Sequence, residues 1–219
     1  MAAKSIFAIY GASGHGRETM PHARGMIERR RPGSTLVFVD DNAGAESVNG
    51  HRVMTYRQFL QIDADERYVN IAIADSTTRR ALAERCERDG IAFFSVVADN
   101  AVVLDAAEIG EGSILSPFVL LTSNVRIGRH FHANMYSYVA HDSVIGDYVT
   151  FAPAVKCNGN VVVEDHAYVG TGAILRNGKP GEPLVIGRGS VVGMGAVVTR
   201  SVPAGVTVAG NPARPLRKS

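Results

Sequence analysis

The chain has 219 residues, 46% of them hydrophobic, and its 23 lysines and arginines against 21 acidic residues leave a formal net charge of +2. This balance gives no reason to expect nucleic acid as the main partner, and no apolar run approaches the ~20 residues of a membrane span, so the sequence predicts a cytoplasmic protein. Cys86 and Cys157 belong to no CxxC motif or Cys/His cluster, so neither a disulfide framework nor a metal site is expected.

Short apolar runs alternate with helix-like segments in the first part of the chain. The predicted strands are 5–10, 36–40, 68–74 and 92–97, and the predicted helices are 17–30 and 77–89. Asp75 precedes the second helix as a candidate N-cap, and Gly90 follows it, where a left-handed residue ends helices well. This order predicts βαβ units and a Rossmann-like α/β domain with a short parallel sheet over residues 1–97.

A glycine-rich loop, 11–16 (GASGHG), separates the first predicted strand from the first predicted helix. Backbone N–H groups and the helix dipole suit a phosphate at such a position. The spacing is G-x-x-G-x-G and not the G-x-G-x-x-G of dinucleotide sites, so an NAD site is not favoured. A tight structural turn remains the alternative interpretation.

A six-residue repeat takes over from residue 97. One aliphatic or small residue recurs at Val97, Val103, Ile109, Leu115, Leu121, Ile127, Ala133, Val139, Ile145, Phe151, Cys157, Val163, Val169 and Leu175, then after a five-residue insertion at Ile186, Val192 and Val198. A single phase held this long is not expected of a β-sandwich. It predicts a parallel β-helix over residues 98–219, in which three hexapeptides form one coil and residues 18 apart stack in a column.

Stacking places a candidate base beside a backbone donor. Two adjacent columns contain Ser123, His141, Gly159 and Asn177, and Asn124, Asp142 and Asn160. His141 is therefore expected about 5 Å from the Gly159 backbone, one strand spacing away. Acyl transfer to an amine needs a base and an oxyanion donor, and Asp142 is placed to orient the histidine. The alternative is a solvent-facing His-Asp pair that serves solubility.

The segments 138–147 (YVAHDSVIGD), 169–173 (VGTGA) and 209–214 (AGNPAR), together with the glycine loop, resemble the hexapeptide-repeat family of sialic-acid O-acetyltransferases and nucleotide-amino-sugar N-acetyltransferases. The resemblance covers essentially the whole chain. It implies acetyl-CoA as cosubstrate, a homotrimer and a left-handed β-helix, although general crossover rules favour right-handed connections.

The resemblance also implies residue roles. His141 matches the family's base, Asp142 the acidic residue that assists it, and the Gly159 backbone the group that faces the acetyl carbonyl. Many members have Glu at the position of Asp142, so its reach toward the histidine is expected to be shorter. The remaining matches are Asn134, near the acceptor sugar, and Gly172, Ala173, Asn211 and Pro212, at coenzyme A.

With a transferase in the second half, the loop is interpreted as the site that holds the pyrophosphate of a nucleotide sugar through Ser13 and Gly14. His15 then reaches the sugar or phosphate, and Asp40, at the end of the second strand, meets the ribose or base. The expected reaction is direct acetylation of the C-4 amine of a nucleotide-linked 4-amino-4,6-dideoxy sugar for surface polysaccharide. O-acetylation of a sugar hydroxyl and a non-catalytic β-helix scaffold are the alternatives.

Overall fold

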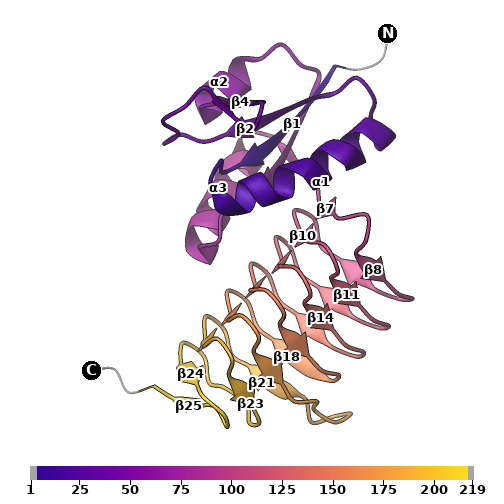
Figure 1. Ribbon diagram of the computed structural model, residues 1–219, viewed down its shortest axis with the longest axis vertical. Coiled ribbons are helices and arrows are strands. Elements are labelled where there is room, and N and C mark those ends of the chain that lie inside the picture. The colour runs from indigo at the N-terminus through magenta and orange to yellow at the C-terminus, as the bar shows by residue number, and fades with distance from the viewer. Residues whose placement is uncertain (1–3, 217–219) are drawn as a thin grey trace. The chain divides into compact units, whose positions relative to one another are not determined.

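The structure is a computed structural model that describes residues 4–216 of the chain. Contacts divide the chain into two compact units, Met1–Asp99 and Asn100–Ser219, each of which is drawn in its own colour range in Figure 1. No helix within residues 4–216 is long and apolar enough to cross a bilayer.

The first unit is built on a mostly parallel six-stranded sheet with the order β3-β4-β2-β1-β5-β6. Its strands are β1 (Ser5–Tyr10), β2 (Thr35–Val39), β3 (Ser47–Val48), β4 (His51–Met54), β5 (Glu66–Ile71) and β6 (Ala92–Phe93), and β7 (Val96–Val97) follows them in the chain. Every residue of β1 is buried, as expected of the central strand of a sheet that is covered on both faces.

Three helices accompany this sheet, namely α1 (Gly14–Arg30), α2 (Tyr56–Gln61) and α3 (Ser76–Arg88). The chain crosses from β1 to β2 toward one edge of the sheet and from β5 to β6 toward the other. Right-handed crossovers therefore place α1 and α3 on opposite faces, as Figure 1 shows.

The predicted strands 5–10, 36–40 and 68–74 and both predicted helices are confirmed, with boundary shifts of up to three residues. The predicted strand 92–97 is instead divided into β6 and β7, and only β6 belongs to the six-stranded sheet. The α1 helix starts earlier than expected, because Ser13 is its N-cap and the glycines themselves form its first turn. Asp75 caps α3 by accepting the Thr78 N–H at 2.7 Å. The sequence prediction missed the β3–β4 hairpin and α2, which are too short to show a clear periodicity.

The second unit is a left-handed parallel β-helix with three sheets. The first sheet contains β10 (Ile114–Leu115), β13 (His132–Ala133), β16 (Thr150–Phe151), β19 (Tyr168–Val169), β22 (Val191–Val192), β24 (Thr207–Ala209) and β25 (Arg214–Pro215). The second contains β8 (Val102–Val103), β11 (Leu120–Leu121), β14 (Tyr138–Val139), β17 (Lys156–Cys157), β20 (Ile174–Leu175) and β23 (Val197–Val198). The third contains β9 (Glu108–Ile109), β12 (Arg126–Ile127), β15 (Val144–Ile145), β18 (Val161–Val163) and β21 (Leu184–Ile186).

The strand register confirms the predicted 18-residue coil. Val139 pairs with Cys157, which pairs in turn with Leu175. After the insertion the partner of Val163 is Ile186, five residues later than the 18-residue rule gives. The extra residues form a small projection closed by the mutual backbone hydrogen bonds of Lys179 and Glu182, so they leave the stack of coils uninterrupted.

The repeated residues form the core of the β-helix. From Leu115 to Val198 each predicted inward residue is at most 5% exposed. The expectation fails at the start of the repeat, where Val103 is 41% exposed and Val97 and Ile109 are only half-buried. Val103 belongs to the first coil of this unit, which has a neighbouring coil on one side only, so its side chain is not enclosed.

Left-handed backbone residues form the corners between the sheets. Asn124, Asp142 and Asn160 stack at one corner with φ values of 59°, 57° and 55°. Asn and Asp are enriched in this conformation because their short polar side chains tolerate it better than bulky ones do. The corner therefore favours Asp over Glu beside His141.

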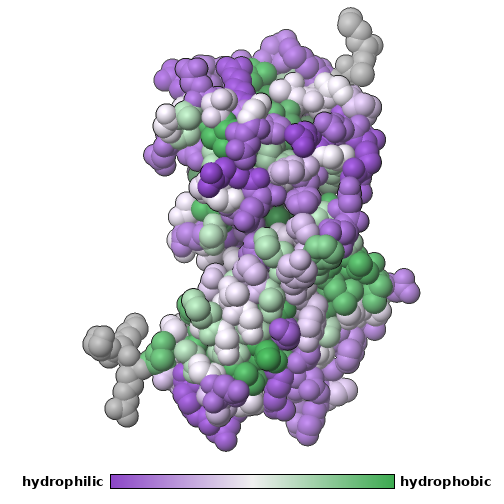
Figure 2. All heavy atoms as spheres, in the orientation of Figure 1, coloured by the Kyte–Doolittle hydropathy of each residue, from purple (hydrophilic) through white to green (hydrophobic). Residues whose placement is uncertain are grey.

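Aromatic side chains stack along the other two corners. Phe118 and Tyr136 are both exposed, with ring centroids 5.0 Å apart. Tyr148 lies between His130 and His166 at 5.1 and 5.2 Å. In Figure 2 hydrophobic surface gathers on the N-terminal coils of the β-helix, where Phe118 and Val103 belong to the exposed apolar residues.

Candidate active site

His141 and Asp142 form a side-chain pair on the outside of the β-helix, at the corner between the sheets that contain β14 and β15. His141 Nδ1 lies 2.7 Å from Asp142 Oδ2, and the two side chains are 60% and 50% exposed. Asn124 Nδ2 approaches the other carboxylate oxygen at 3.4 Å. With its Nδ1 at the carboxylate, the imidazole presents Nε2 as the free proton acceptor.

Gly159 lies directly against the imidazole of His141. A Cβ atom built on Gly159 would stand 2.6 Å from both Cε1 and Nε2 of the ring, far inside van der Waals contact. The Gly159 carbonyl accepts the Gly178 N–H, and the His141 carbonyl accepts the Asn160 N–H, both at 2.9 Å. The predicted stacking of His141 on Gly159 is therefore observed, and only glycine fits beneath the ring.

The N–H group of Gly159 donates to no other group among residues 4–216. Arg129 and Asp147 occupy the same position of the hexapeptide in another corner. There the Arg129 N–H donates to the Asp147 carboxylate at 2.8 Å, and the Asp147 N–H donates to the Asp165 carboxylate at 2.9 Å. Each acceptor lies one coil further along the β-helix. The comparison indicates that N–H groups at this position face outward, so that of Gly159 is a donor available beside the imidazole.

A hollow of about 420 Å³ adjoins the His141–Asp142 pair. It is lined by Ala106, Glu108, Asn124, Arg126, Asp142 and Val144. These residues belong to two columns of the 18-residue register, so counting in steps of 18 from Asp142 and Val144 finds them in the sequence. Glu108 and Arg126 were not predicted as site residues, because their column is not next to that of the histidine.

Asp142→Asn is expected to lower kcat by less than loss of the histidine does. The amide still approaches Nδ1 of His141, but it no longer carries the charge that stabilises a protonated ring. Steady-state kinetics with Asn124→Ala as a control for the neighbouring hydrogen bond measures the effect. An Asp142→Asn variant with unchanged kcat would show that the carboxylate does not assist His141.

Neither cysteine has the surroundings of a nucleophile. Cys86 and Cys157 are fully buried, and burial raises the pKa of the Cys86 thiol to about 11 and that of Cys157 to about 12. Since the thiolate is the reactive form, both thiols are inert at neutral pH. The interpretation of Cys157 as an inward core residue is confirmed.

We therefore expect Cys157→Ala to retain kcat within a few-fold, and the folded protein to keep its activity in iodoacetamide at pH 8. Mass spectrometry of the treated protein should find both thiols unmodified until denaturant is added. Inactivation that accompanies alkylation of Cys157 would contradict direct transfer without a covalent enzyme intermediate.

The other predicted β-helix residues lie at different corners. Asn134 is half-buried and its side chain donates to the Phe151 carbonyl at 2.8 Å. Gly172 is a left-handed corner residue with φ of 70°, next to the buried Ala173, whose N–H and carbonyl both bond within the β-helix. Asn211 and Pro212 are exposed in the turn after β24. Within one chain these residues do not meet His141.

The glycine loop of the first unit is shaped by its own contacts. A Cβ on Gly16 would stand 1.8 Å from the Gly11 carbonyl oxygen, so this glycine is required for the turn itself. Ser13 and Gly14 are exposed, and a Cβ on Gly14 would meet nothing. The Asp40 carboxylate accepts the N–H groups of Ala12 and Asn42, both at 2.9 Å, and thereby fixes the loop to the end of β2.

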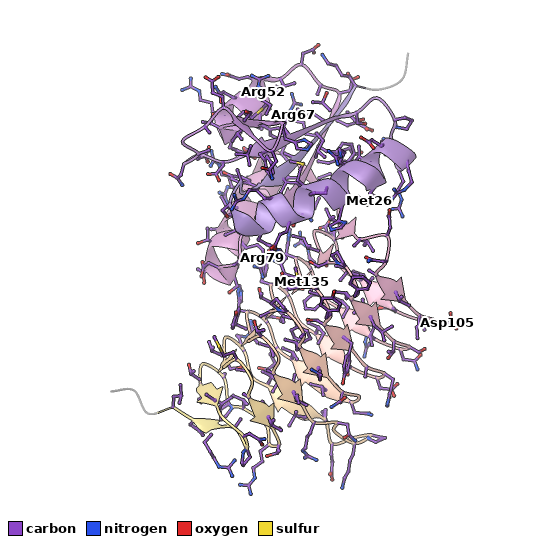
Figure 3. All side chains as sticks on the ribbon, in the orientation of Figure 1. Met26, Arg52, Arg67, Arg79, Asp105 and Met135 are labelled. Atoms are coloured by element: carbon purple, nitrogen blue, oxygen red, sulfur yellow. The ribbon has the colours of Figure 1, made fainter. Side chains whose placement is uncertain are left out.

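His15 lies inside the first unit. Burial, with a smaller contribution from the charge of Arg79, lowers the pKa of His15 from 6.5 to about 4. Arg79 is fully buried on α3, donates to the carbonyls of Ile73 and Ala74, and is labelled in Figure 3. His15 is therefore neutral at pH 7 and acts there as a hydrogen-bonding group without charge.

This lowered pKa predicts a pH-dependent stability. Between pH 6.5 and about 4 the unfolded chain protonates His15 while the folded chain does not, so the free energy of unfolding decreases as the pH falls through this range. His15→Asn is expected to remove this contribution. Urea denaturation of both proteins at pH 7, 6, 5 and 4 tests it, and equal pH slopes would contradict it.

A cavity of about 770 Å³ opens beside the end of β2, where Asp40 forms part of its wall. The rest of its lining comes from the loop 43–47, the β3–β4 hairpin and the start of α2. Asp40 was predicted as a site residue, but the cavity was not, because loop residues of mixed polarity carry no periodic signal. No group of three or more His, Cys, Asp or Glu side chains within residues 4–216 is placed to hold a metal ion.

Known proteins share both units. The PglD N-terminal domain matches residues 7–86. GDP-perosamine N-acetyltransferase of Escherichia coli O157:H7 is 49% identical over 216 residues, which cover 98% of each chain. The solved structure of WeeI from Acinetobacter baumannii AYE is 54% identical, with a TM-score of 0.94 over 97% of this chain and 100% of that one.

A further solved structure contains the acetyl donor. It is the acetyltransferase domain of PglB from Neisseria gonorrhoeae FA1090 in complex with acetyl coenzyme A, which is 28% identical with a TM-score of 0.86 over 97% of this chain and 100% of that one. The chain thus combines 49% identity along its full length to an N-acetyltransferase with the observed geometry of His141 and Gly159. The chain therefore belongs to the family of acetyl-CoA-dependent sugar N-acetyltransferases that includes GDP-perosamine N-acetyltransferase.

Proposed function

We propose that the chain transfers the acetyl group of acetyl-CoA to the C-4 amine of GDP-perosamine, a nucleotide-linked 4-amino-4,6-dideoxy sugar, for lipopolysaccharide biosynthesis. The observation that supports this substrate most strongly is the 49% identity, along the full chain, to an enzyme of that activity. Residues 1–97 are assigned to the nucleotide sugar and residues 98–219 to acetyl transfer.

The proposed reaction is a direct transfer in a ternary complex. The amine nitrogen attacks the thioester carbonyl carbon, and Nε2 of His141 accepts the proton that the nitrogen loses. The Gly159 N–H donates to the oxyanion of the tetrahedral intermediate, and Asp142 stabilises the protonated imidazole. Collapse of the intermediate breaks the C–S bond, and the CoA sulfur leaves with the proton from His141. The exposed pair at 2.7 Å and the unbonded N–H support these roles.

Substrate contacts follow from the same proposal. The exposed residues Ser13 and Gly14 bind the pyrophosphate at the N-terminus of α1, where backbone N–H groups and the helix dipole favour an anion. Neutral His15 and Asn134 hydrogen-bond the sugar. Coenzyme A lies along the partly exposed backbone at Gly172, supported by the buried Ala173.

The turn that contains Asn211 and Pro212 completes the proposed coenzyme site at the C-terminal end of the β-helix. This places the donor on the C-terminal coils. The hollow beside Asp142 is lined by residues of earlier coils, so it remains available to the acceptor sugar.

We also propose a homotrimer. The exposed stacked rings of Phe118 and Tyr136 are apolar surface that a partner subunit would cover, and His141 is too exposed in one chain to exclude water from the reaction. Light scattering of the 23.3 kDa chain should give three times the monomer mass. A fully active monomer at assay concentration would contradict this assembly.

Product analysis tests the function. Purified protein is incubated with acetyl-CoA and either GDP-perosamine, the matching GDP sugar with a C-4 hydroxyl, or a dTDP-linked 4-amino sugar. Acetylation of the amine on the GDP sugar is expected, with much slower reaction of the other two. Preferred acetylation of the hydroxyl would favour an O-acetyltransferase, and no turnover of any sugar would favour a binding scaffold.

A further inference from the structure

The cavity at the end of β2 has the size and position of a nucleoside site. Its volume of about 770 Å³ lies within the range of roughly 300–1,000 Å³ that small-molecule sites occupy. The crossovers that start from β1 and β5 run to opposite edges of the sheet, and ligands of such sheets bind outside the carboxyl ends of the strands where the order reverses. The cavity opens at the carboxyl end of β2, which is the strand next to β1 in the sheet.

Asp40 connects the cavity to the phosphate loop. Its side chain lines the cavity, and its carboxylate accepts the Ala12 N–H of the loop 11–16 at 2.9 Å. A diphosphate bound at that loop therefore directs its nucleoside toward the cavity. The wall that meets the base comes from the segment between Glu46 and Gln58.

Two oppositely charged side chains of this wall are unpaired. Glu46 and Arg52 both line the cavity and are exposed, and neither side chain makes a hydrogen bond or ion pair within residues 4–216. The β3–β4 hairpin brings the backbones of Glu46 and Arg52 close to each other. Arg52 pairs with Ser47, and the Val53 N–H donates to the Glu46 carbonyl at 2.8 Å. Figure 3 labels Arg52 on this hairpin.

This pair of charges matches one nucleobase. Guanine presents two adjacent donors, N1–H and its exocyclic amine, to which a carboxylate binds with both oxygens, and its O6 and N7 accept both N–H groups of an arginine. Uracil offers a single N–H between two carbonyls, and adenine offers an acceptor where guanine has N1–H. A carboxylate that faces either base meets acceptors, which repel it and cost binding energy.

We propose that this cavity recognises guanine, with Glu46 accepting N1–H and the exocyclic amine and Arg52 donating to O6 and N7. The assignment rests on the proposed function, because it supplies the nucleotide specificity of that substrate. Glu46 and Arg52 are then specificity-determining residues, and they belong to a loop and a hairpin of the first unit, whereas the catalytic groups belong to the β-helix.

Calorimetry of the full chain with GDP and IDP tests the proposal, because IDP lacks only the exocyclic amine. The wild-type protein is expected to bind GDP about 10-fold or more tightly than IDP, the effect of one hydrogen bond to a charged group. Glu46→Ala should weaken GDP binding and bring the GDP-to-IDP ratio near one. Arg52→Ala should weaken both ligands equally and keep the ratio, since both retain O6 and N7.

Glu28→Ala, which removes an exposed carboxylate of α1 away from the cavity, is the matched control and should bind as the wild type does. Equal binding of GDP and IDP by the wild type, or an unchanged ratio in Glu46→Ala, would overturn the guanine assignment. Turnover of GDP-perosamine in that case leaves the proposed function intact. Acetylation of a UDP- or dTDP-linked amino sugar in preference to the GDP sugar would instead overturn the proposed substrate.

Discussion

His141→Ala is expected to lower kcat by roughly 10²–10⁴-fold, the usual contribution of a positioned general base. Nε2 of His141 is the proton acceptor next to the Gly159 N–H, and without it the amine must lose its proton to water. His141→Asn should be similarly impaired, because the amide fills part of the space but is a far weaker base. Steady-state kinetics with the amino sugar and acetyl-CoA measures both variants.

The stability of the His141 variants should be nearly that of the wild type, since the side chain lies outside the buried core and is 60% exposed. Thermal unfolding verifies this. His22→Ala, which removes a histidine from α1 in the other unit, controls for the loss of an imidazole. A His141→Ala enzyme with near-normal turnover would remove His141 from the mechanism.

Gly159→Ala is expected to reduce kcat by about 10²-fold or more, although the new methyl group leaves the backbone N–H in place. The added Cβ would stand 2.6 Å from the imidazole, so the ring must rotate away from Asp142 and from the reacting amine. The backbone of Gly159 is not in the left-handed region, so alanine introduces no conformational strain of its own.

A double-mutant cycle separates this steric effect from other causes. If the methyl group acts by displacing the ring, Gly159→Ala should add little to the loss already caused by His141→Ala. Gly25→Ala serves as the control, because its Cβ would approach only the flexible end of Arg29, at 3.3 Å. Fully multiplicative losses in the double variant would show that Gly159 acts independently of His141.

The sequence was most informative where the structure is periodic. Steps of six in the sequence identify the buried residues of the β-helix, and steps of 18 predict that His141 stacks on Gly159. The repeat fixes which side chains point inward because each coil must stack on the next with its backbone hydrogen-bonded. The prediction for Val103 was wrong because periodicity does not indicate where the stack ends.

Features made by irregular backbone escaped prediction. The cavity that contains Glu46 and Arg52 depends on the path of the segment 43–50, in which no residue type recurs at a fixed spacing. The burial of His15 depends on the packing of α3, since the nearby Arg79 comes from a distant part of the chain. Sequence alone suggested His15 as a polar contact, but the low pKa of its imidazole follows only from the fold.

The 18-residue register also determines how stability is distributed along the second unit. Each coil is hydrogen-bonded only to the coils before and after it, so an end coil opens at the cost of one interface and an interior coil at the cost of two. His141 and Gly159 belong to successive interior coils. Fraying can therefore start at the exposed valines of the first coil while the reacting groups keep their geometry.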